Sequence, residues 1–137
     1  SASLDWTVMV WNTATGECEQ VLSGHQGSVL GVAAVPEGRL ASCSSDCTLR
    51  IWCLASGSCI RVLEGHGGMV RGLASLPGEL LASASTDKTV RLWRLADGAC
   101  DQVLKDHAGG VFGVAALPDG LLASAPSGRT VRRVGGA

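Results

Sequence analysis

Serine, histidine and aspartate residues recur along this chain in a combination that could support nucleophilic catalysis. The two trios, separated by 41 residues, are His25, Ser42 and Asp46, and His66, Ser83 and Asp87. In a serine hydrolase such a trio activates the serine, because the histidine takes the hydroxyl proton while the carboxylate orients the imidazole. A catalytic triad occurs once per active site, however, whereas this trio occurs twice, with the same spacing between its members. We therefore interpret it as part of the scaffold and predict that the protein is not an enzyme.

The cysteines could support metal binding, since four of the six lie close together in the sequence. They are Cys43, Cys47, Cys53 and Cys59. None of them forms a Cys-x-x-Cys pair, and alternation along strands would point near neighbours to opposite faces of a sheet. We therefore predict no metal site and no other cofactor. Cys18, Cys59 and Cys100 are also spaced by 41 residues within apolar strand patterns, and we expect them to be small buried side chains.

The same spacing relates landmarks that carry no catalytic chemistry. Tryptophan recurs at Trp11, Trp52 and Trp93, and residues 24–64 align with residues 65–105 without a gap, with 21 identical positions. Such self-similarity is the signature of a repeated structural unit. Because aromatic residues make up only 4% of the chain, we expect the core to consist of Val, Leu, Ile, Ala and the four tryptophans.

Each unit is predicted to contain four short strands, because short apolar runs alternate with turn residues. In the second unit the expected strands are residues 29–35, 40–44, 48–54 and 59–63. None of these runs is long enough for a typical helix. Four antiparallel strands in about 40 residues form one blade of a β-propeller.

The motifs of this unit resemble those of the WD-repeat family. The Gly-His to Trp signature spans residues 24–52 and 65–93, and a Leu-Ala-Ser-x-Ser-x-Asp-x-Thr segment occurs at residues 40–48 and 81–89. The Asp that commonly follows the Trp is replaced by Asn12, Cys53 and Arg94, at a position that often varies in the family. The resemblance covers the whole chain.

The resemblance implies a hydrogen-bonded network of four side chains inside each blade. By position, its members are His25, Ser42, Asp46 and Trp52 in one unit and His66, Ser83, Asp87 and Trp93 in the next. Their chemistry agrees, because a histidine bridges a carboxylate and a hydroxyl while the indole N–H supplies one more donor. The fourth unit keeps His107 and Ser124, but Gly128 and Val134 stand where the Asp and the Trp are expected.

The predicted fold class is all-β, a partial WD-repeat β-propeller of about three and a third four-stranded antiparallel blades. We treat residues 1–137 as a single segment with parts 1–23, 24–64, 65–105 and 106–137, of which the first and last are partial. The chain would begin within a strand and expose a sheet edge. We therefore favour a segment of a longer ring, whose remaining blades pack against it, over an assembly of copies. An isolated copy is expected to self-associate.

The charges of the chain argue against nucleic acid and membrane surfaces as partners. Lys and Arg number 11 and Asp and Glu number 12, so no basic footprint is present. The balance is uneven along the chain: residues 1–38 contain four acidic residues and no Lys or Arg, whereas Arg129, Arg132 and Arg133 lie near the C-terminus. Because neither a bilayer-spanning apolar run nor a signal-peptide pattern is found, we expect an intracellular protein of the cytoplasm or nucleus.

The function implied by the resemblance is a non-catalytic scaffold that binds other proteins. One alternative is a purely structural component of a large assembly, such as a ciliary or ribosome-associated complex. Another is the substrate-recognition part of a ubiquitin ligase. An enzyme with its active site at the channel mouth would need a non-repeated acid, base or metal cluster, and we find none in the sequence.

The candidate partner-binding residues occupy one strand position at which the repeats differ in chemistry. Between a fixed Val and a fixed Gly, the chain has Leu30, Arg71 and Phe112. In the family this position faces the channel mouth, and arginine and aromatic residues are enriched at interface hot spots. The alternative is that a solvent-facing residue varies without consequence. We predict that these three residues, with Ser44 and Ser85 beside them, form a partner-binding rim.

Overall fold

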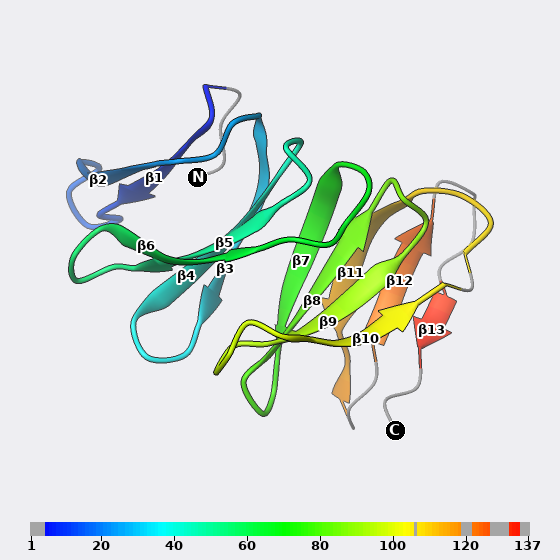
Figure 1. Cartoon of the computed structure of the whole chain (residues 1–137). Coiled ribbons are helices and arrows are strands. Elements are labelled where there is room, and N and C mark those ends of the chain that lie inside the picture. The colour runs from blue at the N-terminus through cyan, green and yellow to red at the C-terminus, as the bar shows by residue number, and fades with distance from the viewer. Residues whose placement is uncertain (1–4, 106, 119–121, 127–131, 135–137) are drawn as a thin grey trace.

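The computed structural model contains four antiparallel sheets that follow one another along the chain (Figure 1). It describes residues 5–105, 107–118, 122–126 and 132–134. Blade 1 consists of β1 (Thr7–Trp11) and β2 (Cys18–Ser23), and blade 2 of β3 (Val29–Val35), β4 (Arg39–Ser44), β5 (Leu49–Cys53) and β6 (Ser58–Leu63). Blade 3 consists of β7 (Val70–Leu76), β8 (Leu80–Ser85), β9 (Val90–Arg94) and β10 (Cys100–Leu104). Blade 4 consists of β11 (Val111–Ala116), β12 (Leu122–Pro126) and β13 (Arg132–Val134).

The predicted all-β fold of four-stranded antiparallel sheets is confirmed. The strands of blade 2 agree with those expected to within one residue at each end, and residues 29–105 contain no helix. Trp11, Trp52 and Trp93 lie at equivalent sites on β1, β5 and β9. The turn between β3 and β4 has two residues with positive φ, Glu37 at 66° and Gly38 at 66°. A turn with positive φ at both central residues matches the twist of the strands that it joins, which explains the tight antiparallel pairing.

Neighbouring blades pack face to face through apolar side chains. Between blades 2 and 3, Ile51 and Leu63 belong to the same buried cluster as Leu81 and Trp93. Polar side chains add a repeated contact at the outer edge of the first two junctions. Gln20 of blade 1 donates a hydrogen bond of 2.6 Å to the Leu54 carbonyl of blade 2, and Arg61, the equivalent residue of blade 2, donates to the carbonyls of Ala96 and Asp97.

The inner strands β3, β7 and β11 lie side by side and come closest at glycines (Figure 1). A Cβ atom added to Gly72 would lie 3.1 Å from the Cα of Gly113 and 3.3 Å from the carbonyl oxygen of Phe112. These are backbone atoms of the next blade, so they cannot move without shifting the strand. The fixed glycine after the variable rim position therefore sets the distance between adjacent blades.

Two expectations about burial are wrong. Cys18 and Cys100 are exposed and Cys59 is only partly buried, because all three lie at the start of the outermost strand of a blade. The four tryptophans do not all belong to the core either. Trp52 and Trp93 are fully buried, but Trp6 and Trp11 are 51% and 47% exposed, since no described sheet precedes blade 1.

No helix among the described residues is long and apolar enough to cross a membrane.

The close approach of the inner strands predicts that Gly72→Ala destabilises the protein by ~1–3 kcal/mol, because the added methyl group meets backbone of the next blade. Gly31→Ala is the matched control. Its Cβ would lie 3.1 Å from the Cys43 thiol, a side-chain atom of the same blade, while the backbone of the next blade begins at 3.9 Å. Both changes restrict the unfolded chain equally. Urea unfolding followed by tryptophan fluorescence should show the larger loss for Gly72→Ala, and equal losses would contradict the inferred packing.

Candidate functional site

Four side chains of blade 2 form a hydrogen-bonded chain that passes through a fully buried serine hydroxyl. The imidazole of His25 lies between a carboxylate and this hydroxyl, with Nδ1 at 3.0 Å from Asp46 Oδ2 and Nε2 at 2.7 Å from Ser42 Oγ. The Trp52 indole N–H donates to the same Ser42 Oγ at 2.8 Å. An indole N–H only donates, so Ser42 accepts from Trp52 and directs its own hydrogen to His25. The His25 Nδ1–H then donates to Asp46.

Blade 3 repeats this chain almost atom for atom. His66 Nδ1 lies 2.8 Å from Asp87 Oδ2, and its Nε2 lies 2.7 Å from Ser83 Oγ. The Trp93 indole N–H donates to Ser83 Oγ at 2.8 Å. All eight side chains named for these networks are thus brought together in two sets of four.

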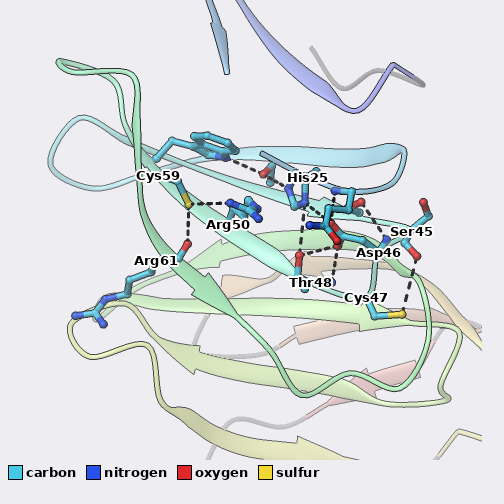
Figure 2. Close-up of polar contacts among 12 residues, drawn as sticks. His25, Ser45, Asp46, Cys47, Thr48, Arg50, Cys59 and Arg61 are labelled. Atoms are coloured by element: carbon cyan, nitrogen blue, oxygen red, sulfur yellow. Dashed lines mark hydrogen bonds and ion pairs between the residues drawn. The ribbon is translucent and has the colours of Figure 1, made fainter. Parts of the chain in front are cut away.

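The aspartates are held by a threonine that sequence analysis did not assign to the network. Figure 2 shows His25, Asp46 and Thr48 side by side, with the Thr48 hydroxyl donating to Asp46 Oδ1 at 2.6 Å. The Thr48 and Gln26 amides donate to the same carboxylate at 2.9 Å each. The repeat spacing of 41 residues could have revealed the threonine, because it relates Thr48 to Thr89. Thr89 donates to Asp87 in blade 3 through both its amide and its hydroxyl.

The surroundings of each histidine and aspartate lower the pKa of both side chains. Burial alone would raise the pKa of Asp87, but hydrogen bonds from Thr89, His66 and the Gly67 amide hold that pKa at about 2. Burial lowers the pKa of His66 below its ordinary value, although the neighbouring Asp87 opposes this effect. Asp46 and His25 are shifted in the same directions. At neutral pH each site therefore holds a neutral imidazole and an ionised carboxylate.

This arrangement favours a structural role for the serine over a nucleophilic one. Ser42 and Ser83 are 0% exposed, so a substrate could not reach their oxygens in this conformation. Each hydroxyl already accepts from an indole and lies within hydrogen-bond distance of an imidazole. Groups of three or more side chains suited to a metal ion do not occur in the described parts of the chain.

Blade 4 retains the histidine–serine contact of the other blades. His107 Nε2 lies 2.9 Å from Ser124 Oγ, and both residues are buried. Gly128, which takes the place of the aspartate, lies outside the described residues, and Val134 takes the place of the tryptophan on β13.

An arginine packed against the glycine of each Gly-His pair is a further repeated feature that sequence analysis missed. The Arg50 guanidinium donates to the Cys59 thiol at 3.6 Å (Figure 2), and a Cβ atom on Gly24 would lie 2.8 Å from Arg50 Nη1. Arg91 has the same relation to Cys100 at 3.7 Å. The glycine before each histidine thus leaves room for a guanidinium that packs against the outer strand.

The structure places the residues of the predicted partner-binding rim partly at the surface and partly in the interior. Arg71 and Phe112 are exposed and touch, with the guanidinium carbon 5.2 Å from the centre of the ring, while Leu30 is partly buried. Ser44 and Ser85, which we expected beside them, are 0% exposed and belong to the interior. Their hydroxyls face inward because each accepts a hydrogen bond of 3.1 Å from the backbone amide of the aspartate two residues later.

Comparison with known proteins gives one family and one type of fold. The family model described as "WD domain, G-beta repeat" matches residues 16–53 and 57–94. Among solved structures, the chain is similar to the WD40 β-propeller domain of Doa1, with a TM-score of 0.90 and 29% sequence identity. The match covers 96% of this chain and 44% of that chain, so this chain spans less than half the length of that structure. No curated protein matches the sequence.

The buried network predicts that His66→Ala destabilises the protein by ~1–3 kcal/mol, because Ser83 and Asp87 each lose a hydrogen-bond partner inside the blade. Gln102→Ala, on the exposed face of β10, is the control and should change stability by less than about 0.5 kcal/mol. Denaturant unfolding measures both. A loss at His66 no larger than that at Gln102 would refute a stabilising role for the network.

Acid is expected to destabilise the protein in two pH ranges. A group whose folded pKa is lowered contributes stability that is complete above its unfolded pKa and is lost as the pH falls. For His25 and His66 this loss begins below about pH 6.5, and for Asp46 and Asp87 it runs from about pH 4 toward the folded pKa of about 2. Thermal unfolding followed by circular dichroism should show a lower Tm at pH 5 than at pH 7.5. The double variant His25→Gln, His66→Gln should reduce this difference in Tm. A higher Tm at pH 5 than at pH 7.5 would contradict the lowered pKa of the two histidines.

Proposed function

Because this chain belongs to the WD40 repeat family, we propose that it binds other proteins through the rim residues Leu30, Arg71 and Phe112. Propellers of this family generally act as protein-interaction scaffolds. The observation that carries the choice of site is the exposed contact between the Arg71 guanidinium and the Phe112 ring, which come from adjacent blades.

The backbone beneath this pair holds it in place. Val70 and Val111, which precede Arg71 and Phe112, are 0% exposed and anchor the start of β7 and β11. Gly72, which follows Arg71, allows the two strands to approach closely, because a Cβ atom there would lie 3.1 Å from the Cα of Gly113. A binding surface that is ordered before its partner arrives loses less conformational entropy on binding.

The chemistry of the pair suggests what a partner would present. The Arg71 guanidinium forms no ion pair with any described residue, and its planar fork suits a carboxylate. Phe112 is 45% exposed and offers an apolar surface next to this charge. We therefore expect a partner segment with an acidic side chain next to an apolar one.

The cysteines support placing this function inside the cell. All six are free thiols, and disulfides are rare in the reducing cytoplasm and nucleus. We propose that the protein works in one of these compartments, with other proteins as its partners and without a nucleic-acid or membrane ligand.

The proposal predicts that Arg71→Ala and Phe112→Ala each weaken partner binding at least threefold without unfolding the protein. Leu117→Ala is the control, because Leu117 is also exposed but follows the opposite end of β11. Quantitative affinity purification from cells, with each variant as bait, identifies proteins lost from both rim variants and kept by the control. If every captured protein binds the rim variants within threefold of the unmodified chain, the binding site lies elsewhere.

A further inference from the structure

The three rim residues share one backbone feature, because each is the extra residue of a β-bulge near the start of an inner strand. In blade 3, Val70 and Gly72 pair with consecutive residues of β8, so Arg71 between them has no pairing partner on that strand. The same shift in register occurs at Leu30 in blade 2 and at Phe112 in blade 4. A bulge turns its extra side chain out of the regular alternation of the strand. The bulge therefore lets this position carry different chemistry in each blade.

The three bulges lie side by side across blades 2, 3 and 4, because each rim residue directly precedes one of the close glycines. A Cβ atom on Gly31 would lie 4.0 Å from the Cα of Gly72, and one on Gly72 would lie 3.1 Å from the Cα of Gly113. Since a carbon–carbon bond is about 1.5 Å long, neighbouring inner strands come within about 6 Å of each other at this level. The rim residues thus form a row that follows the order of the blades.

The middle of this row is a positive charge at the surface. Arg71 is exposed although described blades flank it on both sides, and its guanidinium forms no ion pair with a described residue. Lys88, in the turn between β8 and β9, is a second exposed cation without such a pair at the same end of blade 3. The Asp87 carboxylate of that turn already accepts hydrogen bonds from its own blade. A partner is therefore expected to present a negative charge here, between apolar groups that cover Leu30 and Phe112.

An extended polypeptide segment matches the spacing of this row. Its residues rise by about 3.3 Å and their side chains alternate between two sides, so the side chains on one side repeat every ~6.6 Å. A helix, by contrast, docks through a broad apolar face into a groove, whereas the row offers one side chain per blade. The geometry therefore favours an extended segment that crosses the three inner strands.

Resting on the proposed function of the rim, we propose that its partner presents an extended segment with the pattern apolar–x–acidic–x–apolar. The three residues on one side of this segment face Leu30, Arg71 and Phe112, one in each blade. The acidic side chain forms a charge-assisted hydrogen bond with the Arg71 guanidinium, which lies 5.2 Å from the centre of the Phe112 ring. The pattern reads the same in both directions, so it does not depend on the orientation of the segment.

NMR titration of the isotope-labelled 137-residue chain with capped synthetic peptides tests the pattern. The alternating peptide is Ser-Leu-Ser-Glu-Ser-Leu-Ser. The displaced peptide, Ser-Leu-Glu-Ser-Ser-Leu-Ser, has the same composition but places the acid on the other side of the segment. We expect the alternating peptide to bind at least fivefold more tightly and to shift the amide signals of Gly72 and Gly113. A helical peptide with the same three side chains at four-residue intervals should bind no more tightly than the displaced peptide.

A charge exchange between protein and peptide tests the central contact. Arg71→Glu should weaken binding of the alternating peptide at least tenfold and should make the chain prefer a peptide in which Lys replaces the Glu. Leu117→Ala is the control, because Leu117 is exposed beyond the opposite end of β11, and it should bind the alternating peptide like the unmodified chain. Tryptophan fluorescence of the buried Trp52 and Trp93 verifies that both variants stay folded.

The pattern is overturned if the alternating and displaced peptides bind within twofold of each other, or if neither binds at millimolar concentration. It is also overturned if the helical peptide binds most tightly, or if Arg71→Glu leaves the preference for Glu over Lys unchanged. Affinity purification tests the rim itself independently of these peptides. If cellular partners are lost from Arg71→Ala and Phe112→Ala while the peptides are not distinguished, the rim remains the binding site and the pattern alone is wrong.

Discussion

The rest of the structure depends on the need to satisfy a buried hydroxyl in every complete blade. Ser42 and Ser83 lie on the second strand of their sheets, with no access to water, and an unpaired polar group in such a place costs about 1–3 kcal/mol. Each hydroxyl is satisfied from both sides, by a tryptophan of the third strand and by a histidine that precedes the first strand. One oxygen thereby fixes the strand pairing and the loop that enters the blade.

The network lies close to the strand start that carries the proposed binding surface, because Ser85, two residues before Asp87, pairs with Val70 at the start of β7. The aspartate that holds the histidine lies in the turn between the second and third strands, next to the serines that we had placed on the rim. Arg71 and Phe112 lie at the start of the inner strands, where buried valines and close glycine contacts leave little freedom. The repeated residues thus stabilise the blades, while the non-repeated Arg71 and Phe112 are exposed at the proposed binding surface.

Most of the fold and of the network was predictable because the repeat assigns each residue to an equivalent position in a blade. The strand limits of blade 2 follow from the alternation of apolar runs and turn residues, and the four network residues follow from the resemblance to the WD-repeat family. Exposure was harder to predict, because it depends on the neighbours of a residue. Ser44 and Ser85 are buried because their hydroxyls bind a backbone amide in a tight turn. Trp11 and Trp93 occupy equivalent positions but differ in exposure. Blade 2 packs against Trp93, whereas no described blade precedes Trp11.

The most direct test of the account is hydrogen exchange of the indole N–H groups by NMR. The chain has four tryptophans, of which Trp52 and Trp93 donate to a buried serine, while Trp6 is 51% exposed. The account predicts that the indoles of Trp52 and Trp93 exchange at least a hundredfold more slowly than that of Trp6. It also predicts that Ser83→Ala accelerates exchange at Trp93 while leaving Trp52 largely unaffected. Equal exchange of the three indoles, or no effect of Ser83→Ala on Trp93, would contradict the claim that the buried hydroxyl holds each blade together.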